Sequence, residues 1–354
     1  MRIKKIHIQN YKSLVDFELH HPPSFCAFVG PNASGKSNFF EALEFSNYVA
    51  KFTFETPMLF GGKNSIVSFN PIEIISYLGK RDLLFEVVFE DGLNIYFDTL
   101  FSSTNTERFE SIGSSNSDIN ITQITDLKLR TTQLTQLNST NNKYNKELEI
   151  FFDNFSRIFI GKSELKRINQ SSEKLQVDAS NLSQIIGQIF QDESKKKDFI
   201  EWLRILIPEF NEIEVKQSNI DGSFEFFVYE NGSSKPFPRH LLSDGTKNIL
   251  ALMAAVYQNN QPQFLCIEEP ENGLHPQAIE LLVDFFREKC ESEGHHIWLN
   301  THSPSLVRCL SANEIITLNK KSGQTVAKQF TKEDAVNIKT DEAWLTNMLG
   351  GGVL

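Results

Sequence analysis

The sequence predicts an α/β fold, and three observations indicate it. An apolar run at 25–29 leads into a glycine-rich loop and then into a helical pattern. Short apolar strands alternate with helices across 249–318, which is typical of a parallel sheet. The pairs Asp91-Gly92 and Asp221-Gly222 separate strand-like runs, as tight hairpin turns do. We therefore expect a parallel or mixed sheet with helices on both faces, accompanied by an antiparallel β lobe.

The first two thirds of the chain contain a polar insertion between structured segments. Residues 101–148 are rich in Ser, Thr, Asn and Gln and have few apolar anchors, which predicts a surface insertion. The elements expected around it are, in order, strands at 3–8 and 14–19, the strand at 25–29, a helix at 38–45, a hairpin at 83–89 and 93–97, helices at 182–190 and 199–206, and a hairpin at 213–215 and 224–229.

The last third reads as alternating strands and helices. The expected elements are a helix at 249–257, a strand at 264–267, a helix at 279–288, a strand at 297–299, a helix at 306–310 and a strand at 315–318. We divide the chain into an N-terminal half of the main domain (1–100), an insertion with a helical and hairpin lobe (101–235), and a C-terminal half of the main domain (236–354).

Composition restricts the class of protein. The 354 residues carry a net charge of −10, so the surface as a whole is not built for non-specific nucleic-acid binding, although a local basic patch stays possible. No apolar run approaches the length of a membrane span, and the N-terminus lacks the apolar core of a signal peptide. The four cysteines have no metal-ligand spacing and read as buried thiols. We expect a cytoplasmic protein without membrane contact.

The segment 30–37 fits the phosphate-loop pattern, in which Gly, four free positions, Gly and Lys end in Ser or Thr. Glycines let backbone N–H groups turn toward phosphate oxygens, and the helix that follows places its N-terminus below them. The expected ATP contacts are Gly30, Asn32, Ala33, Ser34, Gly35, Lys36, Ser37 and Asn38. Lys36 would reach the β- and γ-phosphates, and the Ser37 hydroxyl would ligate Mg²⁺.

Two acids, Glu268 and Glu269, end the apolar strand at 264–267, at the strand end where α/β folds place ligands. Mg²⁺ prefers carboxylate and water oxygens, so we expect Glu268 on the metal side. Glu269 would then orient and deprotonate an attacking water. The alternative is a solvated acidic pair at a strand end.

Two further motifs are expected near the phosphates. Leu242 to Thr246 precedes a helix, and the Ser243 hydroxyl with the Gly245 N–H would form a second anion site there. The alternative is that Ser243 merely caps the helix. His302 follows the strand at 297–299 and would hydrogen-bond the γ-phosphate, unless it is incidental to a cap. The adjacent His295 and His296 read as surface residues.

These motifs stand in the order phosphate loop, signature, Walker B and switch histidine, and the chain resembles ABC-type ATPases. It is most similar to the stand-alone predicted ATPases of the AAA-15/AAA-21 group, which are related to the ATPase domain of OLD-family proteins. The resemblance is carried by these residues: Asn10 to Ser13, Gly30 to Ser37, Asp178 to Leu182, Leu242 to Thr246, Ile267 to Pro276 and Thr301 to Pro304.

The resemblance implies an enzyme that binds and hydrolyses ATP with Mg²⁺ and dimerises around the nucleotide. Ser243 and Gly245 would cap the ATP bound to Lys36 of another copy, in a head-to-tail homodimer or a higher oligomer. The same resemblance implies a prokaryotic, antiphage setting with a separately encoded effector such as a nuclease. Glu268 stands where Asp is usual, no Toprim nuclease block follows, and the glutamine of the Q-loop has no assigned position.

Two other functions remain open. One is a DNA-repair ATPase of the RecF or SMC kind that clamps DNA, with basic residues at 162–167 or 195–197 as its contact. A solvated face is the simpler interpretation of both clusters. The other is a module that binds ATP without hydrolysing it, because the Mg²⁺ site at Glu268 is weak. A role as a transporter subunit is disfavoured, because the chain has a long insertion before the signature.

Overall fold

A computed structural model describes residues 2–51, 82–90, 94–100, 109–113, 154–160, 174–335 and 339–349 of the chain. These residues divide into two compact units. The first unit combines Met1–Phe155 with Ser311–Leu354, and the second is Ser156–Leu310. The division differs from our three segments because residues 236–310, which we assign to the main domain, cluster with 156–235 in the second unit. Apart from 109–113, the polar insertion at 101–148 lies outside the described residues.

The first unit is built on an antiparallel sheet of five strands in the order β2-β1-β4-β5-β6. Its strands are β1 (Ile3–Tyr11), β2 (Leu14–His20), β4 (Asp82–Phe89), β5 (Asn94–Leu100) and β6 (Phe109–Gly113). The strands β4 and β5 pair antiparallel, as the sequence predicts, while the expected turn residues Asp91 and Gly92 lie outside the described residues. In β1, Ile6 and Ile8 are fully buried, which is the alternation of a sheet with one covered face.

A second group of elements in the same unit holds the phosphate loop. The strand β3 (Phe25–Val29) is buried at all five positions and runs parallel to β13 (Ile315–Lys321), which pairs antiparallel with β14 (Gln324–Gln329). The helix α1 (Lys36–Lys51) contributes Phe39, whose ring lies 4.8 Å from that of Phe28 and 5.0 Å from that of Phe17. The remaining elements are η3 (Ala312–Glu314), η4 (Lys332–Ala335) and α11 (Thr340–Leu345).

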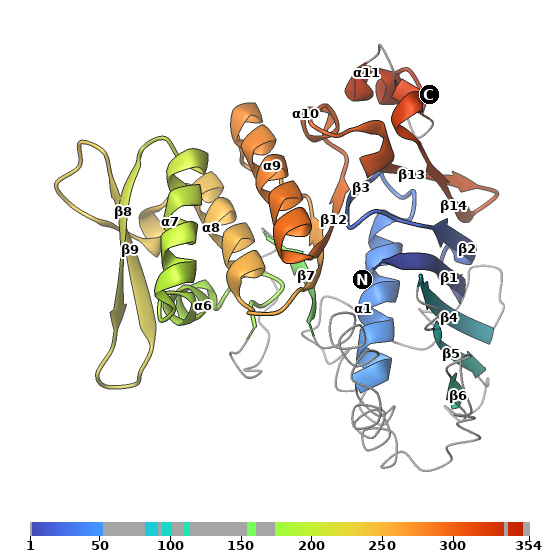
Figure 1. Cartoon of the computed structure of the whole chain (residues 1–354), viewed down its shortest axis with the longest axis horizontal. Coiled ribbons are helices and arrows are strands. Elements are labelled where there is room, and N and C mark those ends of the chain that lie inside the picture. Colours follow the sequence, from blue (N-terminus) through green and yellow to red (C-terminus); the bar gives the residue numbers. More distant parts are fainter. Residues whose placement is uncertain are drawn as a thin grey trace. The chain divides into compact units, whose positions relative to one another are not determined.

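The second unit contains the α/β part of the last third. In its sheet, β12 (His296–Thr301) runs parallel to β11 (Phe264–Glu268), and β7 (Phe155–Phe159) lies on the other side of β11. The helices α7 (Glu193–Leu206), α8 (Asp244–Tyr257) and α9 (Pro276–Glu293) pack side by side (Figure 1). Every residue of α8 from Asn248 to Tyr257 is buried, which explains its uninterrupted apolar sequence.

A small antiparallel sheet completes the second unit, in the order β10-β9-β8. The strands β8 (Phe210–Gln217) and β9 (Phe224–Glu230) form the hairpin that the sequence predicts, and β10 is Phe237–Pro238. The hairpin packs against α7 and α6 (Leu182–Ile189). Short helices η2 (Arg239–Leu241) and α10 (Pro304–Val307) connect the larger elements. The predicted strands, helices and hairpins of the described residues are thus confirmed in kind, with shifted ends.

Candidate functional site

The phosphate loop spans the turn from β3 to α1, and its glycines are required by neighbouring strands. A Cβ at Gly30 would lie 2.3 Å from the Leu318 carbonyl oxygen of β13, and one at Gly35 would lie 2.0 Å from Thr325 Oγ1 of β14. Gly35 also has a φ of +105°, and Ala33 one of +64°. The backbone therefore takes left-handed conformations at these two residues, and such conformations let a loop curve so that its N–H groups face inward.

The loop is held from below by three polar side chains that lie far apart in sequence. Thr325 Oγ1 donates to the Ser34 carbonyl oxygen at 2.9 Å and lies 2.7 Å from Ser13 Oγ. Because the Thr325 proton is used on Ser34, Ser13 is the donor in the second bond. Ser13 in turn accepts from Asn38 Nδ2 at 2.7 Å. Asn38, an expected ATP contact, thus supports the loop.

Lys36 lies inside the loop with its ammonium on the loop's own carbonyl groups. Its Nζ donates to the Gly30 oxygen at 2.7 Å and to the Pro31 oxygen at 3.1 Å. The side chain of Ser34 is buried, whereas Asn32, Ala33 and Ser37 are exposed. A lysine ammonium enclosed by a turned loop at the start of a helix is an arrangement suited to binding phosphate.

Glu268, at the end of β11, is buried and fully paired. Its carboxylate oxygen Oε1 accepts from Arg157 Nε at 2.6 Å and also contacts the second guanidinium nitrogen, NH2. Its other oxygen, Oε2, accepts from Asn300 Nδ2 at 3.2 Å. The side chains of Glu268 and Arg157 are 3% and 4% exposed. Arg157 was not predicted as a site residue, although a charged residue between Phe155 and Phe159 in a short strand-like segment suggests a buried partner.

Glu269 turns away from its strand and meets His302. Its φ is +48°, a left-handed conformation that costs a non-glycine residue about 1–3 kcal/mol. Its backbone N–H donates to the Asn300 carbonyl oxygen at 2.8 Å, and Asn272 Nδ2 donates to Oε2 at 2.9 Å. The other oxygen, Oε1, lies 3.6 Å from Nδ1 of His302, which is half exposed. The two expected catalytic side chains are therefore neighbours.

A second acid, Glu271, lies beside this pair and was also missed. Its Oε1 accepts from Thr301 Oγ1 at 2.5 Å, and its buried Oε2 has no partner among the described residues. Burial raises the pKa of Glu271 above its ordinary value. The three acids at the end of β11 and in the turn after it therefore differ in environment: Glu268 is paired with a cation, Glu269 faces a histidine, and Glu271 is largely desolvated.

The start of α8 is joined to the turn that follows Glu269. A Cβ at Gly245 would lie 2.6 Å from the carbonyl oxygen of Gly273. Asn248 Nδ2 donates to the carbonyl oxygens of Pro270 and Asn272 at 2.9 and 2.8 Å. Ser243 is the N-cap, since its Oγ accepts from the Thr246 N–H at 3.1 Å. Within the second unit, the signature residues and the Glu269–His302 pair thus belong to one bonded cluster.

Comparison with known proteins gives the family. The model of the AAA_21 family, described as "AAA domain, putative AbiEii toxin, Type IV TA system", matches residues 25–308. The chain belongs to this family. That range runs from the strand before the phosphate loop to the residues after His302, and it covers most of the chain. The chain is accordingly an ABC-type P-loop ATPase, an enzyme that hydrolyses ATP.

Individual relatives agree with this class. The chain is 33% identical over 101 residues to the energy-coupling factor transporter ATP-binding protein EcfA1 of Methanospirillum hungatei, a match of 28% of this chain and 35% of that protein. Among solved structures, the SMC head domain from Thermotoga maritima has a TM-score of 0.53 at 15% identity, covering 94% of this chain and all of that one. The SmcHead bound to the C-winged helix domain of ScpA has a TM-score of 0.60 at 16% identity, covering 96% and 100%. These structures share the fold.

Two histidines and one lysine of the second unit are structural residues. His295 and His296 are buried, so their assignment to the surface was wrong. His295 Nδ1 accepts from the Gln263 N–H at 2.9 Å, and burial lowers the pKa of His296 to about 4. In the cluster at 195–197, Lys195 Nζ donates to the carbonyl oxygens of Tyr257 and Asn259, both at 2.9 Å. That lysine is a structural group, and residues 162–167 lie outside the described part of the chain.

The expected metal ligands differ in their fit to Mg²⁺. The Ser37 side chain is exposed on the loop, as a ligand needs to be. Both oxygens of Glu268 are hydrogen-bonded, one of them to a guanidinium, so this carboxylate does not fit a direct Mg²⁺ ligand. No group of three His, Cys, Asp or Glu among the described residues could hold a metal ion. The described cysteines are free thiols, three of them buried.

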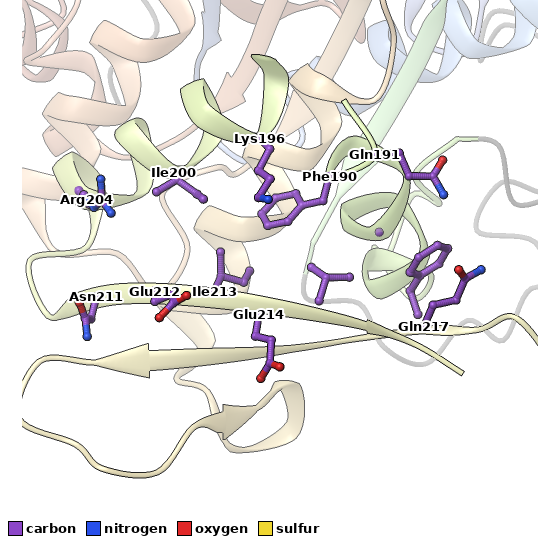
Figure 2. Close-up of a pocket in the computed structure, with 13 residues that line it drawn as sticks. Phe190, Gln191, Lys196, Ile200, Arg204, Asn211, Glu212, Ile213, Glu214 and Gln217 are labelled. Atoms are coloured by element: carbon purple, nitrogen blue, oxygen red, sulfur yellow. The ribbon is translucent and has the colours of Figure 1, made fainter. Parts of the chain in front are cut away.

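A cavity of about 620 Å³ lies elsewhere in the second unit, between α7 and β8. Figure 2 shows Ile200 and Arg204 on its helix side, and Glu212 and Ile213 on its strand side. None of the expected site residues lines it, so the cavity is separate from the cluster around Glu269. None of the helices in the described part of the chain combines the length and apolar character needed to cross a bilayer.

Proposed function

We propose that this ATPase is a switch that dimerises around ATP and opens when the ATP is hydrolysed. The observation that carries the proposal is the position of Glu269. Its carboxylate is oriented by Asn272 and faces His302, while the same turn is bonded to the start of α8 through Asn248. The position of Glu269 would therefore depend on the contacts that Ser243 and Gly245 make with nucleotide.

In the proposed cycle, Lys36 and the loop N–H groups of one chain hold the triphosphate. Ser243 and Gly245 of another chain, together with the N-terminus of α8, supply a second set of donors to the γ-phosphate. Asn32, Ala33, Ser34, Gly35 and Ser37 complete the loop around the phosphates. Each ATP thus needs two chains, and neither chain completes a site alone.

Hydrolysis itself needs a positioned base. Glu269 accepts a proton from water as the water oxygen attacks the γ-phosphorus. The bond between the γ-phosphorus and the bridging oxygen of the β-phosphate breaks, and ADP leaves. His302 hydrogen-bonds the γ-phosphate and reports its loss. Magnesium, when bound with ATP, supplies charge neutralisation on the phosphates, with Ser37 as the one expected ligand that fits it.

The setting we propose is a prokaryotic, antiphage defence complex in which a separate polypeptide, such as a nuclease, is the effector. The family description, which names a toxin of a type IV toxin–antitoxin system, supports a setting of this kind. The polar insertion at 101–148 and the helices of 182–206 are the proposed docking elements.

The second candidate is a DNA clamp of the RecF or SMC kind. The similarity to SMC heads favours it, and the engagement of Lys195 in backbone contacts weakens it. Binding of the purified chain to a DNA duplex, falling steeply with added salt, would support the clamp. Binding below 1% of that of a known clamp would exclude it.

Mixing two inactive variants tests the shared site. Lys36→Ala and Ser243→Arg should each abolish phosphate release, and an equimolar mixture should recover about a quarter of the wild-type rate. The reason is that half of the dimers are mixed and each mixed dimer has one intact site of two. No recovery in the mixture, with both variants folded, contradicts the shared site.

Glu269→Gln should slow phosphate release about 100-fold or more, and it should accumulate dimer in the presence of ATP, measured by light scattering. The matched control, Glu291→Gln on the exposed face of α9, should leave both unchanged.

A further inference from the structure

The pair of Arg157 and Glu268 has the geometry of a closed, internal ion pair. Arg157 approaches Oε1 with both Nε and NH2, and the two side chains are almost fully withdrawn from solvent. The remaining oxygen of Glu268 is used by the Asn300 amide. An Mg²⁺ ion that ligated Glu268 would have to displace a guanidinium that is itself buried.

Such a displacement is unfavourable on two counts. A buried guanidinium deprived of its carboxylate keeps its charge, because arginine is not deprotonated in proteins. Removing one partner of a buried ion pair is strongly destabilising for this reason. Mg²⁺ also gives up its water ligands reluctantly and keeps several of them beside the phosphates, and the phosphate-loop hydroxyl is a further ligand for it. The cation next to Glu268 is already supplied by the chain.

We infer that Glu268 is the counter-ion of Arg157 and is not a ligand of the Mg²⁺ that accompanies ATP, and that Arg157 is a positioning residue for Glu269. This inference rests on the proposed function of the phosphate loop and of Glu269. It also gives β7 (Phe155–Phe159) a role in the reaction through Arg157, which the sequence of this strand does not predict.

The connection from Arg157 to Glu269 runs through Asn300. The side chain of Asn300 donates to Glu268, and its backbone carbonyl accepts from the Glu269 N–H at 2.8 Å. Arg157 holds one carboxylate oxygen of Glu268 and Asn300 holds the other, so the C-terminal end of β11 is held in place on both sides. That fixed end starts the left-handed turn at Glu269 and directs its carboxylate toward His302.

The test compares nucleotide affinity with and without Mg²⁺ in the full chain. A fluorescent, non-hydrolysable ATP analogue is titrated in Mg²⁺ and again in EDTA, and the ratio of the two dissociation constants is the readout. Glu268→Gln should keep the wild-type ratio within twofold. A ratio that falls tenfold or more in Glu268→Gln would show that Glu268 ligates the ion and would overturn the inference.

Because Glu268→Gln leaves a buried guanidinium unpaired, the double variant Arg157→Gln/Glu268→Gln is measured beside it. Each single variant should lower the urea midpoint more than the double variant does, which is the signature of a coupled pair. Arg157→Gln and Glu268→Gln should both slow phosphate release, because Glu269 loses its fixed position in each. Additive losses of stability, or a normal hydrolysis rate in Arg157→Gln, would refute the positioning role.

Two controls separate this inference from the proposed function. Glu193→Gln removes an exposed ion pair with Lys196 and should change neither the ratio nor the rate. If the wild-type chain binds the analogue no better than Lys36→Ala does, the proposed function fails. If the wild-type chain binds it and only the ratio of Glu268→Gln collapses, the inference about Glu268 fails by itself.

Discussion

Thr325 offers the sharpest test of how the phosphate loop is supported. The change Thr325→Val keeps the β-branched shape of a buried side chain that is 2% exposed and replaces its hydroxyl with a methyl group. That hydroxyl donates to Ser34 O and accepts from Ser13. The hydroxyl also faces Gly35, so the methyl group that replaces it has to fit at the same contact.

The size of the effect follows from the two groups left behind. The Ser34 carbonyl oxygen loses a donor at 2.9 Å, and the Ser13 hydroxyl loses an acceptor at 2.7 Å. A neutral hydrogen bond contributes about 1 kcal/mol, and an unsatisfied buried group costs about 1–3 kcal/mol. Since Ser13 still accepts from Asn38 and can rotate, we expect a loss of about 2 kcal/mol in the free energy of unfolding.

The assay combines urea unfolding with titration of a fluorescent ATP analogue. Thr325→Val should lower stability by the amount given above and weaken ATP binding at least fivefold, because the Ser34 segment of the loop is released. Thr325→Ser, which keeps the hydroxyl, should retain most of the affinity. ATP affinity within twofold of wild type in Thr325→Val would refute the reasoning that β14 shapes the loop.

Two further predictions concern the second unit. Asn272→Ala removes the amide that orients Glu269, so phosphate release should fall about tenfold with ATP affinity unchanged, while the exposed control Asn260→Ala should behave as wild type; an unchanged rate in Asn272→Ala would contradict the role of the amide. His296 is buried and neutral, with a pKa lowered to about 4, whereas in the unfolded chain it binds a proton below about pH 6.5. Its contribution to stability is therefore complete above pH 6.5 and is lost progressively as the pH falls toward 4, by about 2 kcal/mol between pH 7 and pH 5. His296→Phe should reduce this loss when urea midpoints are compared at the two pH values, and parallel profiles for the two proteins would show that the histidine has no such role.

The sequence predicts the parts of the site that depend on local patterns. The phosphate loop needs glycines at fixed spacing, and the proximity of Glu269 and His302 follows from the parallel pairing of their strands. Residues that act through long-range contacts were not predicted. Thr325 reads as an ordinary strand residue until β14 places it on Ser13, 312 positions earlier.

Charged and titratable residues were the other source of error. Arg157 and Glu268 are separated by 111 positions, so no local pattern connects them. His295 and His296 follow a glycine and look like loop residues, but β12 begins at His296 and draws it into the core. In each case the position of a polar residue is decided by the strand that lies beside it, which single-sequence patterns do not contain.

The dependence of the phosphate loop on β13 and β14 has a consequence for biosynthesis. Leu318 and Thr325 are needed to shape a loop that the ribosome delivers about 300 residues earlier, which at about 5–20 residues per second means a delay of roughly 15–60 s. During that interval the N-terminal strands and α1 exist without the partners that close the loop. We therefore expect the nascent chain to bind ATP only after β14 has been synthesised. Chains interrupted before residue 325 would then be kept out of any ATP-dependent assembly.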